Sequence, residues 1–272
     1  MDIVTKVLTS MLASLKKRNT IDLIWILWRT DFKLKYNDSI LGFIWVLIKP
    51  FSIFLILYLV LTNIFPFQEE HFVIYLLIGN VFISFWTEGT NLGLDSLLSR
   101  AGLITKVNFP RYTVLISSTS IALVNFLINT IIVFIFVFVN GLRPSLMDVF
   151  WYFLCSGILY MLIITVSMFL SILYVRFRDL KQIWELFNQL LFWMTPVFYS
   201  YEALASKNEI FGLILYWLNP VSVLLISARE AIMENNITLQ LNVLAVMSLF
   251  LVLFYIGYNF YKKQIKKIAE YF

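Results

Sequence analysis

The sequence has few of the residues from which catalytic and metal sites are built. It contains one histidine, His71, and one cysteine, Cys155, and it has neither an HExxH nor a CxxC motif. None of its nine glycines begins the GxxxxGK[ST] loop that cradles nucleotide phosphates. A single cysteine also excludes an intrachain disulfide. We therefore expect no catalytic residue, metal site or cofactor in this chain, and we predict that it is not an enzyme.

Charged residues are also scarce. They make up 14% of the 272 residues, whereas 61% are hydrophobic and 18% aromatic, and the mean hydropathy is +0.85. This composition leaves too little polar surface for a soluble globule and indicates a multispanning membrane protein. Lys16, Lys17 and Arg18 follow the first apolar stretch, whereas a cleavable signal peptide has its positive charge before it. We expect the N-terminus to be retained.

Long apolar runs divide the chain into membrane spans. A helix needs about 20 apolar residues to cross roughly 30 Å of hydrocarbon. Five runs approach or exceed this length, and a sixth, 182–198, is short. The predicted spans are 41–65, 72–90, 112–139, 149–175, 182–198 and 239–261. The polar segments between them are too short for a second domain, so we predict one all-α integral-membrane domain over residues 1–272.

A further apolar stretch, 210–227, is cut by Asn219 and Pro220, and charge decides whether it crosses. Lys and Arg collect in cytoplasmic loops. With six spans and a cytoplasmic N-terminus, 18 of the 21 basic residues lie inside and 3 outside, whereas a crossing at 210–227 changes the split to 15 and 6. We therefore predict six spans and two cytoplasmic termini. Because topology explains the positions of the positive charges, we expect no nucleic-acid partner.

The 210–227 stretch then starts and ends on the outer face. Each half has about nine residues, or roughly 14 Å of helix, and Pro220 breaks the turn before it. We interpret the stretch as a re-entrant helical hairpin between the fifth and sixth spans. Such a hairpin requires that its broken backbone be buried in protein or line a watery cavity. An amphipathic hairpin on the outer surface is the open alternative.

Residues 20–36 have the pattern of a helix that lies flat on the membrane. Asn19 or Thr20 can cap its start, and Asp22 lies in the first turn, where the helix dipole favours a carboxylate. Apolar side chains share one face and charged side chains share another. The apolar face holds Ile21, Ile24, Trp25, Trp28 and Phe32, and the charged face holds Asp22, Arg29 and Lys33. We predict an amphipathic helix in the cytoplasmic interface.

Polar residues recur at helical spacing along four predicted spans. Such stripes allow helices to pack closely and hydrogen-bond to one another. They can also line a conduit in which amides bind sugar hydroxyls while aromatic rings meet apolar C–H surfaces, and both interpretations are open. The stripes are Asn80, Ser84, Thr87 and Asn91; Ser118, Ala122, Asn125 and Asn129; Tyr160, Ser167, Ser171 and Tyr174; and Glu185, Asn188, Phe192, Thr195 and Tyr199. The last is the preferred conduit, because it runs directly into the hairpin.

Ionisable residues deep in the spans, the usual sign of an ion relay, are nearly lacking. Lys49, Glu88 and Glu185 all lie toward span ends. This distribution disfavours an ion-coupled pump. A channel or secondary transporter, with the hairpin as its selectivity element, is the alternative from another class.

Several sequence motifs give more specific information than the composition does. The segment FKLKYNDSILGFIWVLIKP, residues 32–50, has the form K-x-[RK]-Y-x-x-S-x-L-G-x-x-W-x-x-x-x-P. It is followed by ITKVNFPR (104–111), RFRDL (176–180), TPVFY (195–199) and NP (219–220) with Arg229. In these motifs, their order and their spacing, essentially the whole chain resembles the permeases of ABC transporters that export bacterial polysaccharides, the Wzm and TarG group.

The resemblance implies a multi-pass protein of the bacterial cytoplasmic (inner) membrane that works as a homodimer. Two copies of a separate ATPase, which bind ATP and Mg, are expected at the cytoplasmic face. The implied cargo is a lipid-linked polysaccharide on undecaprenyl diphosphate. O-antigen is preferred, while teichoic acid, rhamnan and capsular polysaccharide stay open because the motifs do not separate these exporters. Membrane lipids are the remaining expected partners.

The resemblance also assigns roles to segments. Residues 94–106 match the loop that couples to the ATPase, 20–36 match the interface helix, and 200–235 match an outer gate. The implied residues are Asp95, Arg100 and Lys106 for ATPase coupling; Lys33, Lys35 and Tyr36 for the neighbourhood of the lipid diphosphate; and Asn219, Pro220 and Arg229 for the gate. Attraction of basic residues to anionic lipid is an equal alternative for the second group. Trp45 of the first motif joins the fifth-span residues as a conduit candidate.

Overall fold

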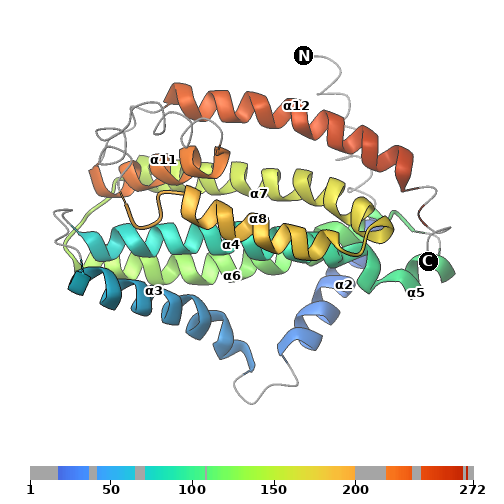
Figure 1. Cartoon of the computed structure of the whole chain (residues 1–272), viewed down its shortest axis with the longest axis horizontal. Helices are drawn as coiled ribbons and strands as arrows, with labels where there is room; N and C mark the ends of the chain where they lie inside the picture. Colours follow the sequence, from blue (N-terminus) through green and yellow to red (C-terminus); the bar gives the residue numbers. More distant parts are fainter. Residues whose placement is uncertain are drawn as a thin grey trace.

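The computed structural model describes residues 18–36, 42–64, 71–107, 109–199, 219–234, 240–265 and 268, and this part of the chain is helical without a strand (Figure 1). The elements are α2 (Arg18–Tyr36), η1 (Gly42–Ile44), α3 (Trp45–Ile64), α4 (Phe72–Ser99), α5 (Ala101–Lys106), α6 (Tyr112–Val139), α7 (Leu146–Arg176), α8 (Leu180–Met194), α11 (Pro220–Glu234) and α12 (Gln240–Gln264). The prediction of an all-α fold is confirmed for these residues.

Four described helices are long and apolar enough to cross a membrane. They are α4, α6, α7 and the Val243–Gln264 part of α12. The apolar part of α3 is shorter, Trp45–Val60, and α8 has 15 residues. The chain is therefore a multi-pass membrane protein. The first part of the predicted outer hairpin, residues 200–218, lies outside the described residues.

Helix α4 is the central element of the bundle. It contacts α3, α6, α7, α8 and α11. The axes of α4, α6, α7 and α12 have roughly the same direction in Figure 1. Two-thirds of the apolar window of α4 is buried, 67%, compared with 28% for α12. Because α4 touches helices as far apart in sequence as α3 and α11, it fixes how the side chains of these helices are placed in the interior.

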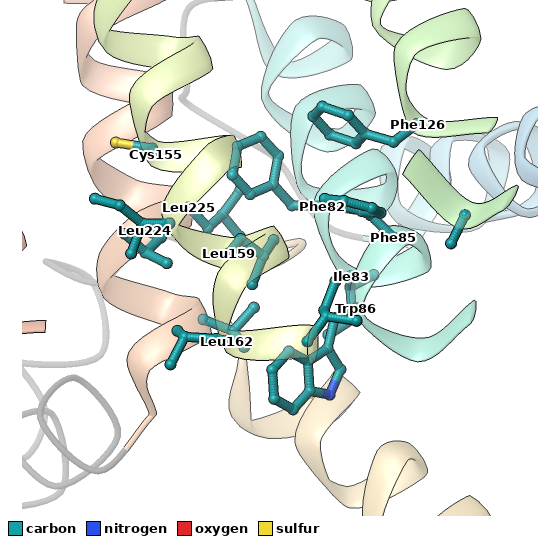
Figure 2. Close-up of a cluster of buried hydrophobic side chains, with 14 of the residues drawn as sticks. Phe82, Ile83, Phe85, Trp86, Phe126, Cys155, Leu159, Leu162, Leu224 and Leu225 are labelled. Atoms are coloured by element: carbon teal, nitrogen blue, oxygen red, sulfur yellow. The ribbon is translucent and has the colours of Figure 1, made fainter. Parts of the chain in front are cut away.

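An aromatic cluster fills the space between α4, α6 and α7. The ring centroids of Phe85 and Phe126 lie 4.5 Å apart, and the Phe82 ring meets Phe126 and Tyr152 edge to face at 5.7 and 5.5 Å. Figure 2 shows Phe82 pointing from α4 toward Leu159 of α7, with Leu224 and Leu225 of α11 behind that helix. Edge-to-face and stacked pairs are favourable ring geometries, so this cluster fixes how the three helices cross.

The connection between α6 and α7 explains how α7 begins. Gly141 follows α6 with a φ of +80°, a conformation that glycine adopts without steric cost. Ser145 and Asp148 then form a capping box, in which the Asp148 amide donates to Ser145 Oγ at 3.3 Å and the Ser145 amide donates to Asp148 Oδ2 at 2.7 Å. These bonds satisfy amide groups that the first turn leaves without helical partners.

Glycines allow α4 and α7 to approach closely. A Cβ atom on Gly89 would lie 2.8 Å from Ile163 Cγ2, and one on Gly93 would overlap the Ser167 side chain. Small residues at such positions permit the backbone contact on which helix association in membranes depends.

We expect Gly93→Ala to destabilise the protein by about 1–3 kcal/mol, the usual cost of overpacking a tight site. The measurement is the temperature at which the purified protein in detergent loses its monodisperse peak. Gly157→Ala on α7 is the matched control, because a Cβ atom there meets nothing within 4 Å. Equal melting temperatures for the two variants would contradict the close contact.

Candidate functional site

A cavity of about 760 Å³ lies between α2, α3, α4, α6 and α8. Its lining residues are Lys35, Trp45, Val46, Lys49, Pro50, Ile53, Asn80, Val81, Ile83, Ser84, Phe85, Thr87, Glu88, Asn91, Leu92, Asn125, Phe126, Asn129, Glu185, Asn188, Gln189, Phe192 and Trp193. The structure thus brings together five predicted site residues. These are Lys35, Trp45, Glu185, Asn188 and Phe192.

Three of the four polar stripes contribute to this cavity. All four members of the α4 stripe line it, and so do Asn125 and Asn129 of α6 and the first three members of the α8 stripe. The α7 stripe does not: Ser167 and Ser171 are fully buried, and Tyr160 lies within 3.2 Å of Ser120 on α6. The predicted conduit residues Thr195 and Tyr199 are also absent from the lining.

Helix α3 contains a proline, Pro50, and side chains of the neighbouring helices bind the backbone oxygens around it. Pro50 has no N–H, so the carbonyl of Val46 one turn earlier has no helical donor. Asn129 Nδ2 of α6 donates to that oxygen at 3.3 Å, and Asn80 Nδ2 of α4 donates to the Pro50 oxygen at 2.8 Å. Two amides that line the cavity therefore also hold its α3 wall in place.

Helix α8 is attached to α4 mainly through polar side chains. Trp86 Nε1 donates to Asn188 Oδ1 at 3.1 Å, Asn188 Nδ2 donates to Asn91 Oδ1 at 3.4 Å, and Trp184 Nε1 donates to Thr90 Oγ1 at 3.1 Å. Asn188 is 4% exposed, so it packs the helix as well as lining the cavity. The other face of α8 is apolar and exposed, with Ile183, Leu186, Phe187, Leu190 and Trp193 at its surface.

Acidic and basic side chains are paired within the cavity. Lys35 Nζ lies 2.5 Å from Glu88 Oε1, and Asn125 Nδ2 donates to the same oxygen at 2.7 Å. Lys49 and Glu185 add one charge of each sign to the lining. Sequence reasoning placed Lys35 beside a lipid diphosphate and gave Glu88 no role, because no local signal connects two residues 53 positions apart. Lys33 is exposed on α2, and the Tyr36 side chain lies outside what the structure describes.

The predicted ATPase-coupling residues surround the corner between α4 and α5. The Arg100 guanidinium pairs with Asp31 of α2 and donates to the Leu27 oxygen at 3.5 Å. Asp95 pairs with Lys181 at the start of α8 at 3.0 Å. Lys106 is exposed at the end of α5. Arg100 and Asp95 thus connect the corner to α2 and α8, while Lys106 faces outward.

Asn219 and Pro220 begin helix α11. Asn219 Oδ1 accepts from the amides of Val221 and Ser222 at 3.1 and 3.4 Å, which makes it the N-cap, and Pro220 occupies the first turn, where its missing N–H costs nothing. Asn219 Nδ2 also donates to Thr195 Oγ1 at 2.9 Å. The asparagine therefore connects the start of α11 to Thr195, the residue that directly follows α8.

Arg229 of α11 holds the irregular segment after α8. The arginine is 3% exposed, donates to the carbonyl oxygens of Pro196 and Val197 (2.8 Å for Val197), and lies 3.6 Å from the centre of the Tyr75 ring. A Cβ atom on Gly79 would overlap the guanidinium, so the glycine makes room for it. Two of the three predicted gate residues, Asn219 and Arg229, thus bind the segment after α8 through hydrogen bonds that sequence spacing does not reveal, while Pro220 begins α11.

Comparison with known sequences adds three findings. The sequence model of the family described as ABC-2 type transporter matches residues 22–233. Two proteins called O-antigen export system permease protein RfbA, both from Klebsiella pneumoniae, are 27% and 25% identical to this chain over 186 residues, which are 68% of this chain and 72% of each relative. A protein of the same name from Myxococcus xanthus is 24% identical over 62% of this chain and 65% of its own length.

We expect Arg229→Lys to lower the free energy of unfolding by about 2 kcal/mol, because an ammonium cannot reproduce the forked hydrogen bonds to two buried carbonyls. The check is the melting temperature of the purified protein in detergent. Arg143→Lys makes the same exchange at an exposed loop position and should behave as wild type. A wild-type melting temperature for Arg229→Lys would show that the fork does not hold the segment.

Proposed function

Because the chain belongs to the ABC-2 type transporter family, we propose that it is the membrane-spanning subunit of an exporter that moves a lipid-linked polysaccharide, O-antigen in the first instance, across the bacterial cytoplasmic membrane. The family is one of membrane subunits of transporters. The cargo is proposed from the relatives in Klebsiella pneumoniae and Myxococcus xanthus, whose names state O-antigen export.

The lining of the cavity is the observation that carries this proposal. It presents six side-chain amides, at Asn80, Asn91, Asn125, Asn129, Asn188 and Gln189, together with the rings of Trp45, Phe85, Phe126, Phe192 and Trp193. Amides donate to and accept from hydroxyls, and aromatic rings offer an apolar face to sugar C–H groups. Pockets of about 300–1,000 Å³ are typical of bound organic ligands, so the volume suits a short saccharide segment.

The charge balance of the cavity favours a neutral polymer. Lys35 and Lys49 face the same space as Glu88 and Glu185, so the two signs offset one another. A polymer with a phosphate in every repeat, such as a teichoic acid, would find no net positive charge in the lining to balance its own negative charges. O-antigen is therefore preferred over teichoic acid, and rhamnan or capsular polysaccharide is the second choice.

A homodimer is proposed because the conduit wall is incomplete in one chain. Trp45 and Trp193, which line the cavity, are 47% and 59% exposed, and the apolar face of α8 continues from there. In the proposal a second copy covers this flank, so that two chains enclose the path. Six spans, with α3 and α8 crossing as the first and fifth, and the outer gate at 200–235 complete the arrangement.

Energy comes from a separate subunit in this proposal. The sequence lacks the GxxxxGK[ST] phosphate loop. In the proposal, two ATPase copies bind at the corner formed by residues 94–106, where Lys106 is exposed. Both termini are then cytoplasmic, on the side of the ATPases, as the distribution of basic residues predicts.

We expect export by the purified chain to require its ATPase. In liposomes that contain a fluorescent polyprenyl-diphosphate-linked oligosaccharide, transfer across the bilayer should occur with both proteins and ATP, and stop when either the ATPase or ATP is left out. An ATPase variant that binds but does not hydrolyse ATP is the control. Transfer or ion flux by the chain alone would favour the channel or secondary transporter and refute the proposal.

We expect Phe192→Ala to lower export at least tenfold while the amount of ATPase bound stays at the wild-type level, because Phe192 lies on the cavity wall and away from the α4–α5 corner. The assay is polymer at the surface of cells, with co-purification of the ATPase as the second readout. Phe138→Ala, an exposed phenylalanine on α6 outside this cavity, is the matched control. Equal export by both variants would assign Phe192 to packing.

A further inference from the structure

Helix α2 packs against α6, and two ion pairs that lie one helical turn apart join it to α4 and to the α4–α5 corner. Asp31 pairs with Arg100 at the α4–α5 corner, and Lys35 pairs with Glu88 inside the cavity. Residues four apart share one face of a helix, so the same side of α2 contacts both places. A movement of the helix at one pair therefore acts directly on the other.

The Lys35–Glu88 pair is the more easily exchanged of the two. Its side chains are 34% and 31% exposed within the cavity lining, and an ion pair that water reaches contributes little net stability. Glu88 also accepts from Asn125 at 2.7 Å, so its carboxylate keeps a hydrogen bond after Lys35 moves away. Lys35 can therefore pair either with Glu88 or with another anion, and in both states Glu88 keeps a hydrogen bond.

The Arg100–Asp31 pair is better protected. Its side chains are 18% and 19% exposed, and Arg100 also donates to the Leu27 oxygen on the same helix. We therefore expect the Arg100–Asp31 pair to persist while Lys35 changes partner. Helix α2 would then rotate around the Arg100–Asp31 contact. This makes the arginine a pivot between the cavity and the corner at which ATPase binding is proposed.

We propose that Lys35 is a phosphate sensor. The phosphate group of an anionic lipid displaces Glu88 from Lys35. A phosphate offers Lys35 several oxygens for charge-assisted hydrogen bonds, whereas the carboxylate of Glu88 already accepts a hydrogen bond from Asn125. Helix α2 transmits this exchange through Asp31 and Arg100 to the α4–α5 corner, and ATP hydrolysis by the partner rises. The inference rests on the proposed function and adds to it a way in which bound cargo starts the cycle.

The test measures ATP hydrolysis by the complete complex, chain and ATPase, in nanodiscs of neutral phosphatidylcholine titrated with undecaprenyl diphosphate. The wild type should be stimulated severalfold. Lys35→Gln should raise the half-maximal concentration at least tenfold, and Lys35→Arg should restore it. Glu88→Gln should lower that concentration and raise hydrolysis without ligand, since the competing carboxylate is gone. Arg29→Gln, which removes a charge from an exposed position of the same helix, should match the wild type.

A second pair of readouts separates binding from transmission. Asp31→Asn should bind radiolabelled undecaprenyl diphosphate as the wild type does and lose its stimulation. Phosphatidic acid at the same mole fraction distinguishes the source of the phosphate: weak stimulation assigns the sensor to the cargo lipid, and equal stimulation assigns it to membrane headgroups.

Identical ligand dependence in the wild type, Lys35→Gln and Glu88→Gln would overturn the sensor. That result would leave the proposed function standing if the same wild-type complex exports polymer with ATP. A wild-type complex that exports nothing would refute the proposed function itself.

Discussion

In hydrocarbon, a backbone N–H or C=O without a partner costs several kcal/mol, so each break in a helix needs a donor or acceptor from elsewhere. Two such breaks lie within the part of the chain that the structure describes, one at Pro50 beside the cavity and one in the segment that follows α8. Asn129 donates to the carbonyl that Pro50 leaves without a helical partner, and Arg229 donates to the two carbonyls after the end of α8. The donors come from α6 and α11, so the irregular backbone depends on the correct assembly of helices distant in sequence.

The need for hydrogen-bond partners in hydrocarbon also explains why the same polar side chains line the cavity and hold helices together. Asn188 faces the cavity and also bonds Trp86 and Asn91, which attach α8 to α4. An amide offers both donors and an acceptor, so one side chain can hold a helix and present polar atoms to a passing ligand. The amides of Asn80, Asn125, Asn129 and Asn188 all donate to other protein atoms, so these lining groups have hydrogen-bond partners without a ligand.

The three ion pairs found among the described residues all join α4 and its corner to α2 or α8. The ion pairs of α2 with α4 and its corner, and of Asp95 with Lys181 at the start of α8, involve the two helices that flank the cavity. Helices α6 and α7, by contrast, contact α4 through rings and small residues. Close packing of that kind resists displacement, whereas partly exposed ion pairs exchange partners. Among the described helices, α4, α6 and α7 thus form a closely packed centre, and ion pairs add to the packing of α2 on α6 and to the attachment of α8 on α4.

The sequence by itself determined the helices and the faces of most of them. Runs of apolar residues near 20 long can only be helical in a bilayer, and the predicted span 112–139 coincides with α6, Tyr112–Val139. The stripe on 182–198 led to α8 and three of its cavity residues, but the helix ends at Met194, so Thr195 and Tyr199 lie beyond it. Only the tertiary structure decided that Glu88 meets Lys35, that Arg100 meets Asp31 and that Arg229 reaches the end of α8. The helical repeat fixes which residues share a face, whereas which face meets which helix depends on the crossing of elements tens of residues apart, and no local pattern encodes that crossing.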